Sequence, residues 1–174
     1  MHWGRHGFLA LLVFAFSLVL ANPARAQIVA LGASNTQGKG VSPSEAWPAR
    51  LESMLQAKGR HVHVSNEGIS GDTTGGMLGR LDSAVPEGTR VVIINFGGND
   101  FRRGRRGGMI VSPAERQANM AAIISALHRR HIRTIVADGI IHSARAAGMV
   151  QPDRIHLTAE GHQWVANRLI GSVR

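Results

Sequence analysis

The chain has 174 residues, and its 20 Lys and Arg outnumber its 11 Asp and Glu, which gives a formal net charge of +9. This length allows one domain with a sizeable core but is short for two. Because the sequence contains no cysteine, disulfides, thiolate catalysis, a lipoprotein anchor and cysteine-bound zinc are excluded. A basic surface of this kind favours contact with anionic lipid or polysaccharide.

The N-terminal part of the chain has the organisation of a secretory signal peptide. A basic start with Arg5 precedes an apolar stretch over 8–20, and Ala24-Arg25-Ala26 offers an A-x-A cleavage site. An uncleaved N-terminal anchor is the less favoured alternative, because the apolar stretch is short for a membrane span. We therefore expect a leader over 1–26, one domain with net charge +7 over 27–174, and a periplasmic or secreted location.

After this leader the pattern alternates strand, loop and helix. Short apolar or alternating runs predict four strands, over 28–31, 61–64, 90–96 and 132–137. The third run is the most apolar in this part of the chain, so we place it at the centre of the sheet. Helices between successive strands imply right-handed crossovers, and hence a parallel sheet that is covered on both faces.

Capping sequences mark the expected starts of several helices. Ser42-Pro43-Ser44-Glu45 and Ser112-Pro113-Ala114-Glu115 are capping boxes with proline at the first helical position, and Thr158 caps a last helix. Pro48 lies deep in the first of these helices, so we expect a separate turn there and a restart of the helix at Pro48. Another helix is expected around Met77.

Polar residues follow three of the predicted strands. The first strand runs into Gly32-Ala33-Ser34-Asn35, the second leads to Ser70 and Gly71, and the third leads to Asn99. The carboxyl ends of parallel strands meet at one edge of the sheet, where open α/β sheets bind their ligands. Taken alone, Ser34 and Asn35 are ordinary turn formers. Their interpretation therefore depends on what the rest of the chain brings to that edge.

The last loop before the final helix supplies Asp153 and His156 to the same edge. A serine hydroxyl is a weak nucleophile and needs a histidine to take its proton. That histidine needs a carboxylate to fix its tautomer and to stabilise the imidazolium, and an Asp-x-x-His spacing lets one loop hold both groups. Acyl transfer also requires donors to the oxyanion, such as a glycine N–H and a side-chain amide. The sequence thus favours nucleophilic catalysis by Ser34.

These blocks resemble the SGNH (GDSL-type) hydrolases, in the branch that contains the periplasmic acyl-CoA thioesterase I/lysophospholipase and the bacterial arylesterases. The resemblance spans about residues 28–170 and rests on four blocks in order, which are Gly32-Ala33-Ser34-Asn35, Asn66 to Thr73, Gly97-Gly98-Asn99-Asp100, and Asp153 to His156.

The resemblance implies a role for each of five residues. Ser34 would be the nucleophile, Asp153 the acid and His156 the base of a catalytic triad. The oxyanion hole would be formed by the backbone N–H groups of Ser34 and Gly71 and by the side-chain amide of Asn99. The implied fold is a three-layer α/β/α sandwich with a flavodoxin-like parallel sheet.

The chain departs from the family pattern in two places. The aspartate that usually precedes the serine is Ala33 here, so the hydrogen bonding of this loop must differ. The segment before Asp153 is also short: residues 138–152 carry no signal beyond one helical turn, where family members usually insert a helix and a strand. We therefore expect four strands, or five with a very short edge strand, and an acyl pocket that is open on one side.

The implied function is a serine esterase that hydrolyses short-chain acyl or aryl esters through an acyl-enzyme on Ser34. No cofactor, metal or nucleic-acid partner is expected, nor is stable membrane insertion after cleavage of the leader. An acyl-thioesterase or lysophospholipase, a polysaccharide deacetylase and a non-catalytic secreted binding module on the same scaffold are the alternatives. The segment 138–152 leaves only Ile140, Ile141, Met149 and Val150 to line a short pocket.

Two further features are expected to lie outside the chemistry. The arginines in 102–106 are interpreted as a solvated loop rather than a nucleic-acid contact, because only Phe101 provides a nearby aromatic side chain. His162 lies on the last helix, where we expect substitution to be tolerated.

Overall fold

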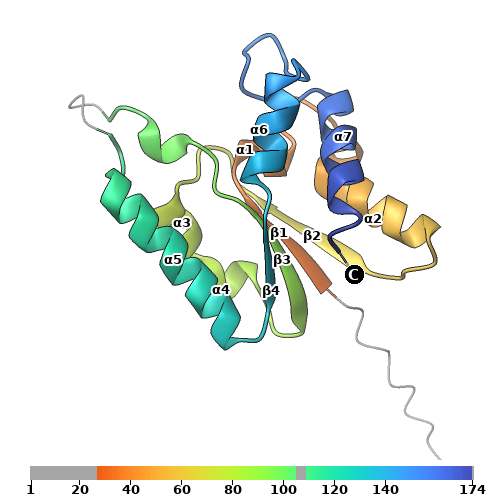
Figure 1. The fold of residues 1–174 in the computed structure, drawn as a ribbon, viewed down its shortest axis with the longest axis horizontal. Coiled ribbons are helices and arrows are strands. Elements are labelled where there is room, and N and C mark those ends of the chain that lie inside the picture. The colour runs from red at the N-terminus through yellow and green to blue at the C-terminus, as the bar shows by residue number, and fades with distance from the viewer. Residues whose placement is uncertain (1–26, 105–108, 174) are drawn as a thin grey trace, which may run out of the picture.

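The computed structural model describes residues 27–104 and 109–173, and in these residues it contains a four-stranded parallel sheet with the order β2-β1-β3-β4 (Figure 1). The strands are β1 (Gln27–Gly32), β2 (His63–Gly68), β3 (Thr89–Asn95) and β4 (Arg133–Val136). This is the flavodoxin-like order without its outer fifth strand. The predicted three-layer α/β/α fold is therefore confirmed, while the leader expected over 1–26 lies outside the described residues.

The helices follow in chain order: α1 (Ser34–Gln37), the short 3₁₀ helix η1 (Pro43–Glu45), α2 (Trp47–Ala57), α3 (Thr74–Gly79), α4 (Leu81–Ala84), the 3₁₀ helix η2 (Asn99–Phe101), α5 (Pro113–Arg129), α6 (Asp138–Ala146) and α7 (Ala159–Leu169). In the described part of the chain, none of them is long and apolar enough to cross a membrane.

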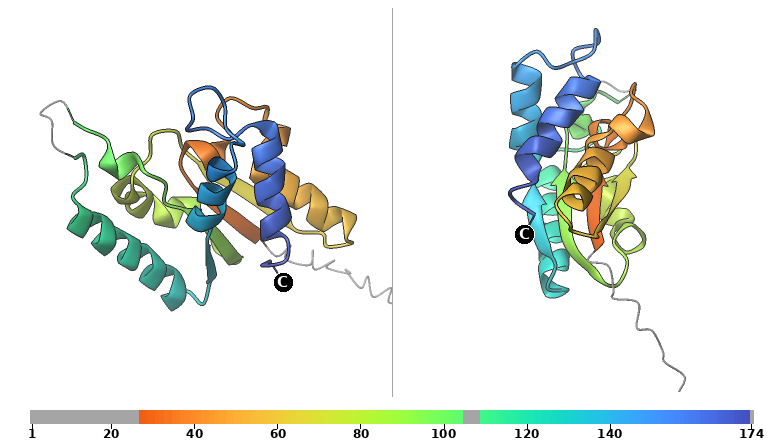
Figure 2. Two further views of the ribbon diagram at one scale, coloured as in Figure 1. Left: turned by 45° about the horizontal axis from the view of Figure 1, so that its top comes forward. Right: turned by 90° about the vertical axis from the view of Figure 1, so that its right-hand side faces the viewer.

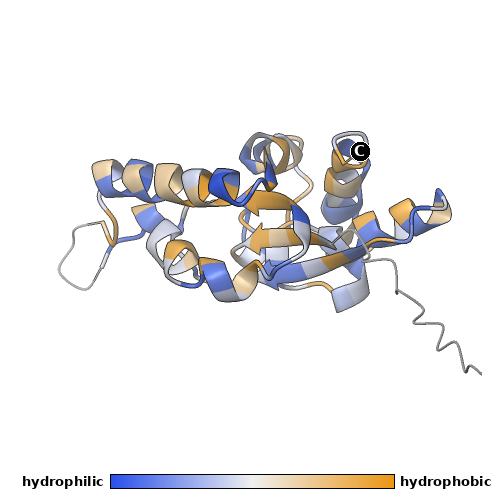
Figure 3. Cartoon of the chain, turned by 90° about the horizontal axis from the view of Figure 1, so that it is seen from below, coloured by the Kyte–Doolittle hydropathy of each residue, from blue (hydrophilic) through white to orange (hydrophobic). Residues whose placement is uncertain are grey.

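Two apolar clusters fill the space on either side of the sheet. Alternate residues of β1 point to opposite faces: Ile28 and Ala30 pack with α2, α6 and α7, whereas Val29 and Leu31 pack with α3, α4 and α5. Accordingly, α5 lies on the far side of the sheet from α2 and α7 (Figure 2). The hydrophobic residues concentrate on the strands between these helix layers (Figure 3). Because both faces are covered, the polar groups of a site have room only at the ends of the strands.

The expected caps define three of the helix starts. The side chains of Ser112 and Thr158 accept hydrogen bonds from the third residue of α5 and of α7. Ser42 and Glu45 form the expected capping box of η1. Ala46 is extended, with ψ of 142°, and separates η1 from α2. The predicted break before the main helix is therefore confirmed, one residue earlier than Pro48.

Two predictions about secondary structure are wrong. The second strand was expected over 61–64, with a loop from Asn66, but β2 runs from His63 to Gly68 because its backbone pairs with all six residues of β1. Polar side chains are tolerated in this edge strand, where pairing rather than burial defines the element. Likewise, 138–152 contains the nine-residue helix α6 instead of one turn. Its few apolar residues suffice because the sheet face receives them.

Candidate active site

The turn that carries Ser34 follows β1 without an intervening loop. β1 ends at Gly32 and α1 begins at Ser34, at the carboxyl edge of the sheet. A Cβ atom on Gly32 would overlap the side chain of Thr36 and lie 3.0 Å from the carbonyl oxygen of Asn95, so the turn requires glycine. Ala33 is buried in the apolar core beside α3 and α5. A methyl group therefore occupies the position of the family's usual aspartate side chain. The contacts that hold this loop must come from other residues.

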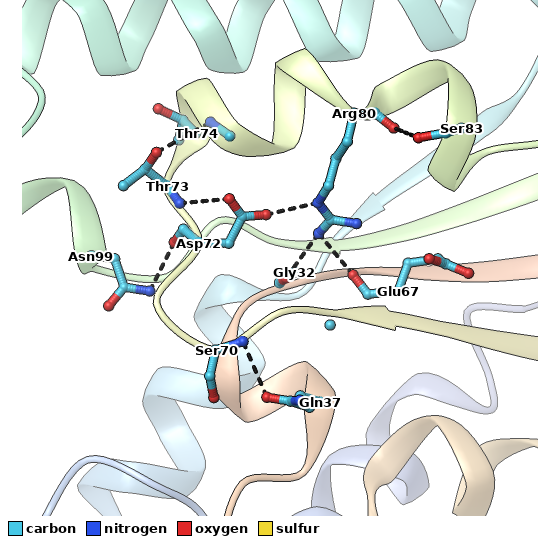
Figure 4. A network of polar contacts seen from close by, with 12 residues as sticks. Gly32, Gln37, Glu67, Ser70, Asp72, Thr73, Thr74, Arg80, Ser83 and Asn99 are labelled. Carbon is cyan, nitrogen blue, oxygen red and sulfur yellow. Dashed lines mark hydrogen bonds and ion pairs between the residues drawn. The ribbon is translucent and has the colours of Figure 1, made fainter.

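The two residues predicted as further oxyanion donors, Gly71 and Asn99, line the same pocket as Ser34. Gly71 has a φ of +85°, in the left-handed region that favours glycine. The side-chain amide of Asn99 donates to the carbonyl oxygen of Asp72, with an Nδ2–O distance of 2.8 Å (Figure 4). Because this amide has two N–H donors, one remains for an acceptor in the pocket. Asn99 is thus fixed in orientation while keeping a free donor.

Arg80 holds the loop that contains Gly71. Its Nε donates to Oδ2 of Asp72 at 2.8 Å, and its Nη2 donates to the carbonyl oxygens of Gly32 and Glu67 at 3.2 and 2.9 Å (Figure 4). One guanidinium therefore joins the ends of β1 and β2 to the loop that follows β2. This role was not predicted, although Arg80 is the one charged residue in the otherwise uncharged stretch 73–81.

Asp100 anchors the loop of Asn99 to the helices behind it. Its carboxylate is fully buried. It accepts hydrogen bonds from the backbone N–H and the hydroxyl of Thr74, at 3.1 and 2.6 Å, and from Nη1 of Arg116 at 2.7 Å. Buried carboxylates require such pairing. The contacts join η2 to α3 and α5, and nothing in the local sequence indicates that Arg116 is the partner.

On the opposite side of the pocket, His156 and Asp153 form a close pair. Nδ1 of His156 lies 2.5 Å from Oδ2 of Asp153. Oδ1 of Asp153 accepts the N–H groups of His156 at 3.0 Å and Ile155 at 2.9 Å. These hydrogen bonds, first the backbone N–H and then the ring of His156, hold the pKa of Asp153 well below its usual range. The carboxylate is therefore ionised and favours the proton on Nδ1, which leaves Nε2 of His156 able to accept one.

Asn35 clamps the segment that contains His156. Its Nδ2 donates to the carbonyl oxygen of Ile155 at 3.1 Å, and its Oδ1 accepts the N–H of Leu157 at 3.0 Å. Asn35, the residue after Ser34, thus forms hydrogen bonds with both residues that flank His156. Gln151 adds a second support, because its N–H donates to the carbonyl oxygen of His156 at 2.8 Å. By sequence Asn35 is only a turn former, and nothing local signals a contact with a segment so distant in the chain.

Ser34, Gly71, Asn99 and His156 line one pocket of about 660 Å³, within the range of small-molecule sites. Contrary to expectation, the segment 138–152 does not leave this pocket without a wall, because α6 contributes Ile141, His142 and Arg145. Of the four apolar residues expected to line it, only Ile141 does so. The prediction for Ile140, Met149 and Val150 is wrong because the segment forms a helix, and a helix presents only one face to the pocket.

The base of the pocket is held by Asp138, the first residue of α6. Its two carboxylate oxygens accept the N–H groups of Phe96 and Gly97, each at 3.0 Å. Burial raises the pKa of this carboxyl group, while the two N–H groups act in the opposite direction. The contact fixes α6 against the end of β3. Within 27–104 and 109–173, no three His, Asp or Glu side chains gather as they would around a metal ion.

The place of His162 in the core argues against the expectation that substitution there is tolerated. Its side chain is fully buried between α2 and α7, and its Nδ1 accepts the N–H of Trp47 at 3.3 Å. Burial lowers the pKa of His162 to about 4. The histidine is therefore an uncharged core residue that joins two helices. Its substitution is not a suitable control for the catalytic variants.

Comparison with known proteins decides the family. Residues 30–150 match the GDSL-like Lipase/Acylhydrolase family. The chain belongs to this family. The resemblance to this family is thereby confirmed, over a range that contains the first three sequence blocks, whereas the catalytic roles of individual residues stay predictions.

Two relatives and one solved structure illustrate the similarity. The chain is 35% identical over 108 residues to Esterase TesA of Pseudomonas aeruginosa, which covers 61% of this chain and 51% of that protein. It is 38% identical over 94 residues to an arylesterase of Vibrio mimicus, covering 53% and 47%. The aligned regions thus span about half the length of these relatives. The crystal structure of TesA superposes with a TM-score of 0.73 at 22% identity, over 85% of this chain and 98% of that one, which supports the fold.

Proposed function

We propose that the protein is a serine hydrolase of carboxylic esters. The observation that carries this proposal is the pocket shared by Ser34, Gly71, Asn99 and His156, together with the pairing of His156 and Asp153. A nucleophile, a base with a free nitrogen and three oxyanion donors suffice for acyl transfer. Membership of an acylhydrolase family and similarity to an esterase and an arylesterase support the same reaction class.

In the proposed mechanism, Oγ of Ser34 attacks the ester carbonyl while Nε2 of His156 takes the hydroxyl proton. The negative oxygen of the tetrahedral intermediate accepts hydrogen bonds from the N–H groups of Ser34 and Gly71 and from Nδ2 of Asn99. His156 then gives its proton to the departing alcohol, and an acyl-enzyme remains on Ser34. Water repeats the sequence, so the carboxylic acid is released and the serine is regenerated.

We infer that the acyl group is short. Among the residues that line the pocket, the aliphatic side chains are those of Ala33, Ile141 and Ile155, and most of the others are polar or glycine. Each buried methylene contributes about 0.8 kcal/mol, which raises kcat/KM only where an apolar wall receives it. With p-nitrophenyl esters from acetate to palmitate, kcat/KM should peak between acetyl and about hexanoyl. A steady rise to long chains would contradict the short pocket and favour a lysophospholipase or long-chain thioesterase.

We also propose that the domain over 27–174 is the mature, periplasmic or secreted enzyme. The support is that Gln27, the first residue after the expected cleavage site, already belongs to β1. Mass spectrometry of the N-terminus of protein recovered from a periplasmic extract tests this proposal. A mature chain that retains residues 1–26 would contradict it.

The decisive experiment concerns Ser34. Ser34→Ala should abolish hydrolysis of p-nitrophenyl acetate without changing the melting temperature, and a fluorophosphonate probe should label Ser34 alone. Ser125→Ala, an exposed serine of α5, is the matched control and should retain full activity and labelling. Full activity of Ser34→Ala, or labelling of another residue, would refute the assignment. A correctly folded protein that hydrolyses no ester would favour the binding-module alternative.

A further inference from the structure

Three cationic side chains surround the pocket and come from separate parts of the chain. Lys39 follows α1, Arg102 follows η2, and Arg145 lies in the last turn of α6. All three are exposed, so their charges face the solvent at the mouth of the pocket. His142 lies one turn before Arg145 and lines the pocket as well.

None of these three side chains forms an ion pair with a carboxylate in the part of the chain that the structure describes. Its four ion pairs are His63–Glu52, Arg80–Asp72, Arg116–Asp100 and His156–Asp153, and none includes Lys39, Arg102 or Arg145. Asp138 is the one acidic residue among those that line the pocket, and both of its oxygens already accept backbone N–H groups. The lining thus carries three cationic side chains and one carboxylate, and a cleft with an excess of one sign of charge concentrates ligands of the opposite sign.

Arg145 contacts the segment that carries His156 through its guanidinium, and the backbone of Lys39 lies next to the same segment. Nη2 of Arg145 donates to the carbonyl oxygen of Arg154 at 3.4 Å. The carbonyl oxygen of Lys39 accepts from Nε2 of Gln151 at 2.8 Å, and the N–H of Gln151 binds the carbonyl oxygen of His156. In the proposed mechanism the alcohol departs beside His156, because it receives its proton there. Two of the three cations therefore lie on the side of the leaving group.

Arg102 lies across the pocket, on the oxyanion side. A Cβ atom on Gly71 would lie 3.9 Å from Nη1 of Arg102. Its charge is thus close to the oxyanion donors rather than to the leaving group. This leaves Lys39 and Arg145 as the pair that would meet a charge on the alcohol.

We propose that the substrate is an ester whose alcohol portion carries an anionic group, a carboxylate or a phosphate, which Lys39 and Arg145 bind. The inference rests on the proposed function, because it assigns the leaving-group side from the proposed roles of Ser34 and His156. It adds a substrate class to that function. Guanidinium and ammonium groups both bind carboxylates and phosphates, so the two anions are distinguished by experiment.

The test compares three aryl acetates that differ only at the meta position: 3-carbamoylphenyl, 3-carboxyphenyl and 3-(phosphonooxy)phenyl acetate. Each kcat/KM is divided by the rate of alkaline hydrolysis of the same ester, which corrects for the acidity of the phenol. At low ionic strength an anionic ester should be preferred over the neutral one by about tenfold or more, and salt should reduce the preference. The better of the two anionic esters identifies the anion.

Variants assign the preference to its residues. Lys39→Gln and Arg145→Gln should each reduce the ratio of anionic to neutral kcat/KM several-fold, and the double variant should reduce it further. Arg129→Gln, on the exposed end of α5, is the matched control and should leave the ratio unchanged. Equal corrected rates for the three esters, or a ratio that survives the double variant, would overturn the inference.

Two further outcomes are distinguishable. A preference for the acyl-side anion of 4-nitrophenyl hemisuccinate, without one for anionic alcohols, would overturn the assignment to the leaving group. If the wild-type protein hydrolyses none of the esters, the proposed function fails together with this inference. If it hydrolyses the neutral ester through Ser34 but shows no preference for anions, only this inference fails.

Discussion

The two sides of the pocket are held in different ways. On the oxyanion side, the loops of Gly71 and Asn99 are anchored by carboxylates that are largely or fully buried and paired with arginines, Asp72 with Arg80 and Asp100 with Arg116. On the side of the base, the carboxylate of Asp153 is 44% exposed and pairs with the histidine in the same loop. That loop is held to the rest of the protein chiefly by the neutral hydrogen bonds of Asn35.

Because of this difference, the groups that hold the oxyanion side should matter for both stability and catalysis, whereas those that hold the base side should matter mainly for catalysis. Breaking a buried ion pair leaves an unpaired charge in the interior, which strongly destabilises a protein. Removal of an exposed carboxylate leaves no unpaired charge in the interior, because water can solvate the group with which it was paired. We therefore expect substitutions in the anchoring ion pairs of the oxyanion side to reduce stability and activity together, and substitutions on the base side to act mainly on activity.

The largest effect is expected for the exposed acid. Asp153→Asn keeps an acceptor for the backbone N–H groups of the loop but no longer favours the tautomer of His156 that accepts a proton at Nε2. We expect kcat for p-nitrophenyl acetate to fall about 10³-fold or more, with a much smaller loss of thermal stability than for a buried carboxylate. Calorimetry and steady-state kinetics on the same sample test this prediction. A clear loss of thermal stability would mean that the base side also supports the fold.

The buried acid should behave in the opposite way. Asp100→Ala leaves the guanidinium of Arg116 unpaired and the N–H and hydroxyl of Thr74 without an acceptor. We expect a loss of about 3–5 kcal/mol in the free energy of unfolding, measured by urea denaturation. Activity should fall as well, because Asn99 precedes Asp100 in the chain. A variant as stable as the wild type would show that the buried pair contributes nothing net.

Asn99→Ala tests the oxyanion donor apart from its anchor. Because the amide would bind the oxyanion only in the transition state, kcat should fall about 100-fold, roughly 3 kcal/mol in the activation free energy, with little change in KM. Steady-state kinetics with p-nitrophenyl acetate measure both constants. A change confined to KM would instead mean that Asn99 binds the substrate in its ground state.

His162 lies outside the pocket, and its lowered pKa predicts how the stability of the protein depends on pH. Its pKa in the folded protein is about 4, below the ordinary value of 6.5. The unfolded chain therefore binds a proton first on acidification, so this contribution is complete above pH 6.5 and is lost progressively as the pH falls to about 4. The loss amounts to about 3 kcal/mol. Urea denaturation between these pH values should show it, and His162→Gln should lack this part of the slope.

The smallest effect is expected for the clamp on the base loop. Asn35→Ala removes the two hydrogen bonds that hold Ile155 and Leu157, and with them the position of His156 relative to Ser34. We expect kcat to fall about tenfold, roughly 1.4 kcal/mol, while KM and the melting temperature change little. Asn35→Asp keeps the acceptor for Leu157 and should recover part of kcat. If both variants lose stability instead, Asn35 is a structural residue and not a positioning one.

The features that could be predicted from the sequence are local in origin. The caps at Ser112 and Thr158, the apolar run of β3 and the four family blocks each lie in a few consecutive residues, so a short window contains their physical cause. Parallel strands bring their carboxyl ends to one edge of a sheet, and this rule suffices to predict that Ser34 and Asn99 lie near each other.

Features that depend on partners distant in the chain could not be predicted and follow from the folded arrangement. The nine residues of α6 form a helix because the sheet offers a face to bury Ile141 and Ala144. The contacts of Arg80 with β1 and of Asn35 with Leu157 likewise join segments that no short window contains. Propensity is a weak guide where such packing and pairing dominate, because the free energy that fixes these residues comes from the neighbours the fold supplies.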